Sequence, residues 1–362
     1  MERTVDGVTY YRREQVPPEF QDLHILTGYR WNAPLRACLR STLHFSDCNE
    51  AGNVWTHLVP ALLLPLVLVA MQVRGGVDLI AARELPFTAA MLGSSVMFAT
   101  SAAAHCFSSY SALARQFCFR CDYAAICVYA VSNTMAFAHY VWPWQHDGVL
   151  GMHAAEAYVL TMFILSTTAC WVTCVSRSWG AVQFKARTAI FAIVYLVCVS
   201  PLCYRYILPL VLPIDVDANP ETAYIWLAHL SLYAAGAAFN ATKFPECKWP
   251  GKFDVAFGSH QWMHVCVAVA VCLNLLAFRY DAPYYGPALD VLGRREATVL
   301  SVFGPVLLFI LLATAIVAYY TLYRPFLHIV PPESPHMMAQ LASQHRYPTR
   351  SSHSRANLGK ND

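Results

Sequence analysis

Apolar residues of this chain fall into eight long runs separated by short polar stretches. The runs cover residues 53–73, 86–107, 117–142, 152–174, 187–208, 223–242, 258–279 and 298–323. Each is close to the ~20 residues that a helix needs to cross the hydrocarbon part of a bilayer. The pattern predicts an all-α membrane protein, with a bundle of seven transmembrane helices over residues 53–279 and an eighth transmembrane helix over residues 298–323.

Both ends of the chain are polar. Residues 1–52 contain proline-bearing stretches that predict turns and short pieces rather than a domain with its own core. The first fifteen residues lack an apolar stretch with a cleavage site, so we expect no secretory signal peptide. Residues 331–362 are rich in Ser, His, Pro and Arg, cannot bury a core, and predict a disordered tail.

Composition supports the membrane assignment. Apolar residues make up 57% of the 362 residues and charged residues only 13%, against about 25% charged in soluble domains. The net charge of +3 is spread over short loops and indicates no nucleic-acid partner. Of thirteen cysteines, ten lie in or beside apolar runs, where a free thiol packs as a small hydrophobic group. Cys118 and Cys121 have a C-x-x-C spacing, but no second pair completes a zinc site.

The basic residues near the ends of the runs predict the orientation. Twelve lie on the side of the N-terminus: Arg30, Arg36, Arg40, Arg115, Arg120, Arg177, Lys185, Arg187, Lys243, Lys248, Lys252 and Arg324. Six lie on the other side: Arg74, Arg83, Arg205, Arg279, Arg294 and Arg295. Because Lys and Arg concentrate in cytoplasmic loops, we expect a cytosolic N-terminus. With eight spans the C-terminus is cytosolic too, and it changes sides if the first or the last run does not span.

Five polar residues on three runs reach the same membrane layer in this topology. His260 and His264 stand at i and i+4, on one helix face, at the inner start of the seventh run. Ser101 and His105 have the same spacing at the inner end of the second run, and Asp122 lies near the inner start of the third. An ionisable residue inside a membrane is costly, which makes this group the candidate functional site.

Three histidines leave the fourth position of a tetrahedral zinc ion open, as in catalytic zinc sites. Zinc lowers the pKa of a water in that position toward about 7 and so supplies a hydroxide nucleophile. Asp122 is a candidate proton acceptor or orienting group, and Ser101 a candidate hydrogen-bond donor to water or substrate. The histidines can instead form an interhelical hydrogen-bonded pair, and a bound metal can be structural rather than catalytic.

Four other polar residues lie near or toward the outer face in this topology. They are His139, His153, Glu156 and His229. We expect them at the membrane interface or facing loops rather than in a second site.

The motifs resemble the progestin and adipoQ receptor (PAQR) family. Residues 49–57 (NEAGNVWTH) resemble its E-x-x-N-x-W-T-H signature. Ser101-x-x-x-His105 and Asp122-Tyr123 match its second and third helices. Residues 244–246 (FPE), 250–254 (PGKFD) and 259–264 (SHQWMH) match its sixth loop and seventh helix. The resemblance runs in order from about residue 20 to 280.

The resemblance implies a seven-helix core with a cytosolic N-terminus. It also implies a zinc ion near the cytosolic face, held by His105, His260 and His264, with Asp122 and Ser101 close to it. The family's wider relatives include alkaline ceramidases, and its adiponectin-receptor branch is thought to hydrolyse ceramide.

The eighth run, residues 24–30 (HILTGYR) and residues 107–111 (FSSYS) are most like the membrane progestin receptor branch. Residues 50–53 (EAGN) and 241–245 (ATKFP) are nearer to the adiponectin-receptor branch. The first branch implies a plasma-membrane receptor for a steroid such as progesterone, which signals through heterotrimeric G proteins. The second implies a zinc hydrolase of ceramide-like sphingolipid amides. A transporter is disfavoured because the polar groups gather on one side of the bilayer.

Overall fold

The computed structural model describes residues 2–75, 78–144, 154–176, 179, 182–291 and 297–323, with side chains of 287–291 excepted. The predicted tail at 331–362, His153, Arg177, Arg294, Arg295 and Arg324 lie outside the described residues. The packing discussed below is that of residues 2–321.

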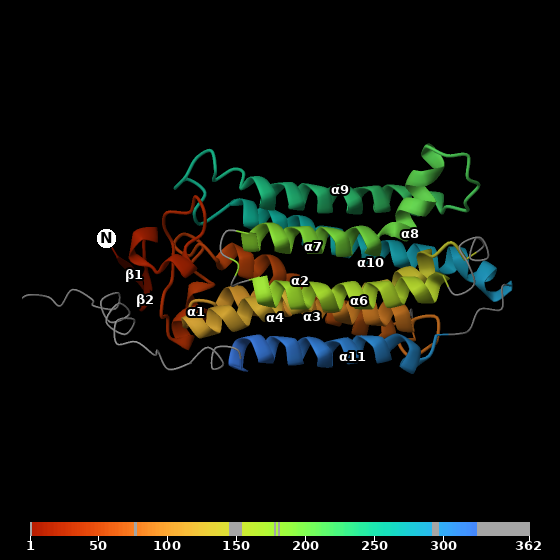
Figure 1. Cartoon of the computed structure of the whole chain (residues 1–362), viewed down its shortest axis with the longest axis horizontal. Coiled ribbons are helices and arrows are strands. Elements are labelled where there is room, and N and C mark those ends of the chain that lie inside the picture. Colours follow the sequence, from red (N-terminus) through yellow and green to blue (C-terminus); the bar gives the residue numbers. More distant parts are fainter. Residues whose placement is uncertain are drawn as a thin grey trace, which may run out of the picture. The chain divides into compact units, whose positions relative to one another are not determined.

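Long helices run side by side and make up most of the described chain (Figure 1). They are α2 (Ala51–Val73), α3 (Leu85–Phe107), α4 (Ala112–Ala136), α6 (Ala154–Val175), α7 (Gln183–Cys198), α9 (Pro220–Thr242), α10 (Ser259–Val291) and α11 (Val299–Ala318). Short elements extend some of them: the π-turns η3 (Phe137–Val141), η7 (Cys203–Ile207) and η9 (Tyr319–Tyr323), the helix α8 (Ser200–Leu202) and the 3-10 turn η8 (Leu208–Leu210). The helical architecture confirms the all-α character of the predicted fold class.

Six helices of the described chain are long and apolar enough to cross a membrane. Helix α7 and the segment from Ser200 to Leu210 make a seventh if the pair counts as one span, bent by 48°. The bend falls where Pro201 follows α7, because proline lacks the N–H that would continue the helix. Helix α9 has 23 residues but is not among the six; it carries Glu221, His229 and Asn240. The count of seven helices plus an eighth therefore stays a prediction.

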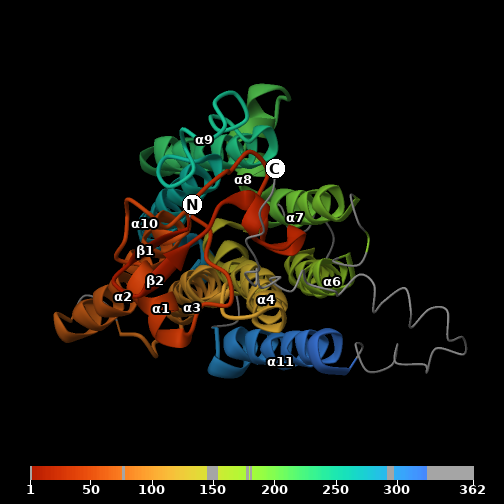
Figure 2. The same ribbon diagram turned by 90° about the vertical axis from the view of Figure 1, so that its left-hand side faces the viewer.

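The outer faces of α2 and α11 carry exposed leucines, as expected of helix faces that contact lipid. The core lies between α3, α4 and α10, where large apolar side chains such as Phe98, Phe137 and Phe278 are fully buried. Helix α11 packs on α4 and α6 and takes no part in the candidate site. In the view along the helices, α4 lies between α3 and α6, and α10 lies between α9 and α2 (Figure 2).

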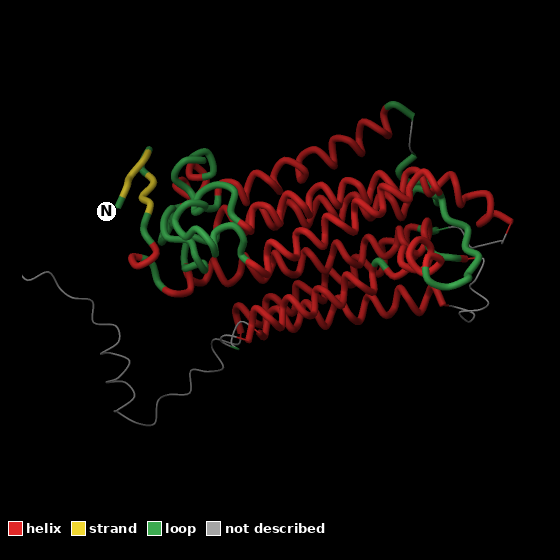
Figure 3. Tube along the Cα trace, turned by 90° about the horizontal axis from the view of Figure 1, so that it is seen from above, coloured by secondary structure: helices red, strands yellow, loops and turns green. Residues whose placement is uncertain are grey.

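The N-terminal residues cover one end of the bundle (Figure 3). They form a hairpin of β1 (Arg3–Val5) and β2 (Val8–Tyr10), the 3-10 turns η1 (Arg13–Gln15) and η2 (Pro18–Phe20), and helix α1 (Leu35–Ser41). Val8 and Tyr10 are buried with Cys38 against Ala102 and Cys106 of α3. The region is thus more ordered than the predicted set of turns, because part of it shares the core of the bundle. Val16, Phe20 and Tyr29 also form a small buried cluster within the region itself.

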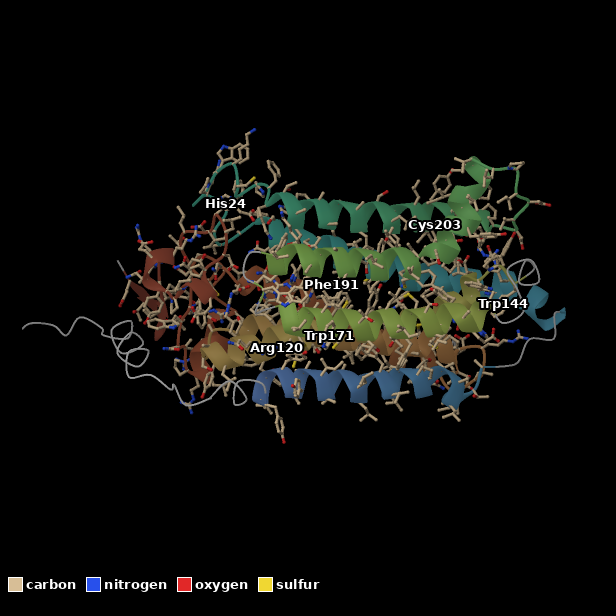
Figure 4. The ribbon with its side chains drawn as sticks, in the orientation of Figure 1. His24, Arg120, Trp144, Trp171, Phe191 and Cys203 are labelled. Atoms are coloured by element: carbon tan, nitrogen blue, oxygen red, sulfur yellow. The ribbon has the colours of Figure 1, made fainter. Side chains whose placement is uncertain are left out.

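The opposite end is held by Arg205, whose side chain is only 2% exposed. Its guanidinium donates to the carbonyl oxygens of Val141, Trp142 and Asp217 and lies 4.0 Å from the centre of the Tyr285 ring. Arg205 is therefore a structural group rather than the free loop charge that the orientation count assumed. Figure 4 shows Trp144 and Cys203 near this end and Arg120 toward the N-terminal end.

Candidate metal centre

Three histidine side chains meet at the N-terminal end of the bundle. The Nε2 atom of His260 lies 3.2 Å from Nε2 of His264 and 3.4 Å from Nε2 of His105. All three ligand atoms lie within 4.8 Å of one another. His105 and His264 are 3% and 2% exposed, and His260 is half-buried. The structure thus brings together the three residues predicted from the sequence.

Two elements hold the histidines in this position. His105 belongs to the last turn of α3, which packs along α2, and α10 contacts both helices. Helix α10 begins one residue before His260, where Ser259 is bound by the buried carboxylate of Glu246. Glu246 accepts a hydrogen bond of 2.7 Å from the Ser259 backbone N–H and another from the Ser259 hydroxyl. An acid at this position satisfies an otherwise unpaired N–H of the helix end and complements the helix dipole.

Glu50 orients His105. Its Oε2 atom accepts a hydrogen bond from His105 Nδ1 at 2.8 Å and another from the Asn53 amide at 2.6 Å. Burial alone would raise the pKa of the Glu50 carboxyl, but the His105 ring, the Asn53 amide and the Arg30 guanidinium hold that pKa well below its usual range. Arg30 also donates to the His105 carbonyl oxygen at 2.7 Å. Because Nδ1 of His105 donates to a carboxylate, its Nε2 carries the lone pair.

Thr56 fixes His264 in the same way. The Thr56 hydroxyl donates to the carbonyl oxygens of Gly52 and Asn53, at 2.9 and 3.0 Å. Its single hydrogen is then used, so the 3.3 Å contact with His264 Nδ1 has the imidazole as donor. His264 therefore also turns a lone pair on Nε2 toward His260. The His57 ring stacks on the His264 ring, with the ring centroids 3.9 Å apart and the ring planes 15° apart.

The three Nε2 atoms form a donor set that fits a metal ion. Neutral imidazoles with these partners bring at most one hydrogen to the cluster, on His260, while His105 and His264 present lone pairs. Two zinc ligands at 2.0–2.1 Å and a tetrahedral angle lie about 3.3 Å apart, which the observed 3.2 and 3.4 Å match. Each of the two outer histidines also has the outer-sphere hydrogen-bond acceptor that metal-bound imidazoles usually have.

Asp122 and Ser101 lie beside this cluster. Both side chains are buried, at 8% and 4% exposed. The Ser101 hydroxyl interacts with the Asp122 carboxyl, and Asp122 faces the His105 ring closely enough to act on its charge. Helix α4 begins at Ala112, five residues earlier than predicted, so Asp122 lies in its third turn rather than its first two.

A small polar cavity, partly open to the surface, lies at the N-terminal end of the bundle. It has room for about one water molecule, and Glu50, Arg30, Asn49, Ser108 and Arg115 contribute to its wall. Because Glu50 also binds His105, the cavity leads to the orienting partner of one candidate ligand.

The sequence did not assign roles to Glu50, Thr56, His57 and Arg30. Glu50, Thr56 and His57 belong to the signature at residues 49–57, which was the available signal for them. Of the residues expected near the outer face, Glu156 is exposed and His139 half-buried. The expectation was wrong for His229, which is 1% exposed and donates from Nδ1 to the Ala270 carbonyl oxygen, at 2.9 Å, inside the bundle.

Comparison with known proteins places the chain in a family. The model of the family described as haemolysin-III related matches residues 45–275, which include every residue of the histidine cluster. The chain belongs to this family. It is the PAQR family whose motifs the sequence resembles, and the relatives described next are named membrane progestin receptors.

Three relatives illustrate the extent of the similarity. Membrane progestin receptor gamma of Mus musculus is 29% identical over 277 residues, which cover 75% of this chain and 81% of the relative. The gamma receptor of Homo sapiens is 27% identical over 329 residues, covering 87% and 95%. Membrane progestin receptor alpha of Mus musculus is 30% identical over 283 residues, covering 74% and 76%. With its apolar helices, the chain is a multi-pass membrane protein.

Proposed function

We propose that His105, His260 and His264 hold a Zn²⁺ ion at the N-terminal end of the bundle. The observation that carries this proposal is the pair of Nε2 contacts at 3.2 and 3.4 Å, combined with Nδ1 atoms that already have acceptors. The ion would tie α3 to α10. A structural ion would fit a receptor, and a catalytic ion would fit a hydrolase. These two functions are considered next.

The function supported best is that of a plasma-membrane receptor for a steroid of the progestin class, with a cytosolic N-terminus. The support is the naming of the relatives as membrane progestin receptors along most of their length. An apolar ligand would enter from the bilayer between the helices. Saturable binding of radiolabelled progesterone to membranes that contain the protein is the test, and absence of saturable binding would contradict the proposal.

Signalling would pass through the loop at residues 242–257, with heterotrimeric G proteins as the proposed partners. The loop carries exposed Lys248 and Lys252 beside Trp249 and Phe253, a basic and aromatic surface suited to a protein partner or to anionic lipid. Glu246 joins this loop to the first residue of α10. A shift of α10 would therefore move the loop.

The second candidate function is hydrolysis of a ceramide-like sphingolipid amide, and one observation favours it. Asp122 and Ser101 interact with each other and lie beside His105, as a proton acceptor and an orienting hydroxyl would. A bound zinc ion would supply Lewis acidity at the amide carbonyl. Asp122 would accept the proton of the attacking water, and Ser101 would hold the carboxyl in place. Ceramide turnover that disappears in Asp122→Ala, while zinc stays bound, would establish this activity.

A further inference from the structure

A second group of polar side chains lies deeper in the bundle, away from the metal centre. His229 and Tyr233 come from α9, Tyr129 from α4 and Tyr195 from α7. The Tyr233 hydroxyl donates to the Tyr129 hydroxyl at 3.0 Å, and the rings of Tyr195 and Tyr233 lie 4.5 Å apart. The His229 ring lies 5.0 Å from that of Tyr233 and 6.4 Å from that of Tyr195.

Two polar atoms of this group are buried without a hydrogen-bond partner among the described residues. They are Nε2 of His229 and the hydroxyl oxygen of Tyr195. Since Nδ1 of His229 donates to the Ala270 carbonyl oxygen, Nε2 of the neutral ring is an acceptor. The Tyr195 hydroxyl brings a hydrogen with no acceptor. A buried polar group left unpaired is costly, so the pair of atoms points to a missing partner.

The helices that carry these atoms pack mainly on other neighbours. Helix α9 packs mainly on α10, and α7 packs mainly on α6, so α7 and α9 approach each other chiefly through the tyrosine rings. Tyr129, Tyr195 and Tyr233 are each half-buried rather than fully buried. Between Tyr233 and the inner end, α9 carries only small residues at positions 234–238 (AAGAA). Gly236 in this stretch lets α9 approach α10 closely, since a Cβ there would lie 3.2 Å from Cβ of Cys266.

The distance from the metal centre to this polar group matches the length of an extended apolar ligand. On α4, Tyr129 follows Asp122 by seven residues, a rise of about 10 Å. On α10, the His229 partner Ala270 follows His264 by six residues, a rise of about 9 Å. A rigid fused-ring skeleton or the upper part of a sphingoid chain spans a distance of this order.

We propose that His229 and Tyr195 bind a hydroxyl group of an apolar ligand lodged between α4, α7 and α9. A hydroxyl donates one hydrogen bond and accepts others, so it satisfies the His229 acceptor and the Tyr195 donor together. A ketone satisfies only Tyr195 and leaves His229 Nε2 unpaired. The pair therefore selects a hydroxylated ligand over its keto counterpart. This inference rests on the proposed function only for the class of ligand skeleton, not for the hydroxyl preference.

The test measures binding of three probes to purified protein: progesterone, its 20-hydroxy analogue, and sphingosine as a hydroxylated lipid without a steroid skeleton. We expect the hydroxylated steroid to bind about tenfold more tightly than progesterone, as one buried hydrogen bond predicts. His229→Phe and Tyr195→Phe should each remove most of this difference. Tyr158→Phe is the matched control, because the Tyr158 hydroxyl already donates to the Cys198 carbonyl oxygen at 2.7 Å.

The outcomes separate this inference from the proposed function. Steroid binding that is equal for both steroids, or unchanged in both variants, would overturn the inference and leave a steroid receptor. If neither steroid binds but sphingosine does, and its affinity falls in His229→Phe and Tyr195→Phe, the hydroxyl site stands and the steroid receptor does not. If no probe depends on either residue, the inference fails. Tyr195→Phe keeps the aromatic ring, so loss of its folding would itself contradict a ligand-binding role for the hydroxyl.

Discussion

Oε2 of Glu50 lies 2.8 Å from Nδ1 of His105, so a residue just before α2 fixes the tautomer of a ring on α3. This relationship ties the first helix of the family signature to the histidine cluster. Helix α2 carries none of the three candidate ligands, but Glu50 just before it and Asn53 in its first turn position a ligand held by α3.

The Glu50→Gln variant should lower zinc affinity by about 10- to 100-fold, the usual effect of removing the orienting partner of a metal-bound histidine. The amide can still meet His105 but no longer favours a single tautomer. Competition with a chelator of known affinity measures the change. Glu19→Gln, an exposed acid in the same N-terminal region, is the control and should have no effect. Equal zinc affinity in Glu50→Gln and wild type would refute the orienting role.

Loss of the Glu246 carboxylate should loosen the start of α10. We expect Glu246→Ala to lower the free energy of unfolding by about 1–3 kcal/mol, because two donors of Ser259 lose their acceptor in a buried position. Ser259→Ala removes only the hydroxyl and should cost less. Thermal unfolding in detergent compares the three proteins. A Glu246→Ala protein as stable as wild type would show that the helix start does not need this contact.

Arg205 should matter for stability and not for the metal. Replacement by alanine removes one donor from each of three carbonyl oxygens, and we expect a loss of about 3 kcal/mol, as for other broken buried charge networks. Arg74→Ala, at an exposed arginine after α2, serves as the control. Zinc content per folded chain should stay at the wild-type value in both variants. A reduced zinc content in Arg205→Ala would mean that the two ends of the bundle are coupled.

The histidine cluster could be predicted because its signals are local. His260 and His264 lie one turn apart, as do Ser101 and His105, and the loop charges alone place their helix ends in one layer. Glu50 and Thr56 gave no such signal, because their roles depend on how α2 packs against α3 and α10. No spacing rule relates a residue on one helix to the ring nitrogen of another.

The positions of His229 and Arg205 could not be predicted from local sequence signals. Both were assigned to the outer face because they stand near the outer ends of their segments. Both are buried, since His229 finds the Ala270 carbonyl oxygen on α10 and Arg205 finds the carbonyl oxygens at the end of η3. A polar side chain in an apolar segment is expected to find an internal partner, but sequence distance does not say which one.

The bound metal also predicts a stability difference. Since the ion would join α3 to α10, His264→Ala should lower the midpoint of thermal unfolding, and removal of zinc from wild type by a chelator should lower it by a similar amount. The chelator should have little further effect on the variant. A His264→Ala protein that keeps both its metal and its thermal stability would show that the ligands have been assigned wrongly.

The most direct measurement is the metal content of purified, detergent-solubilised protein, with wild type beside the double variant His260→Ala, His264→Ala. Three ligands from one chain predict about one zinc ion per chain in wild type and none in the variant. A folded wild-type protein without zinc, or a double variant that retains it, would contradict the proposed metal centre.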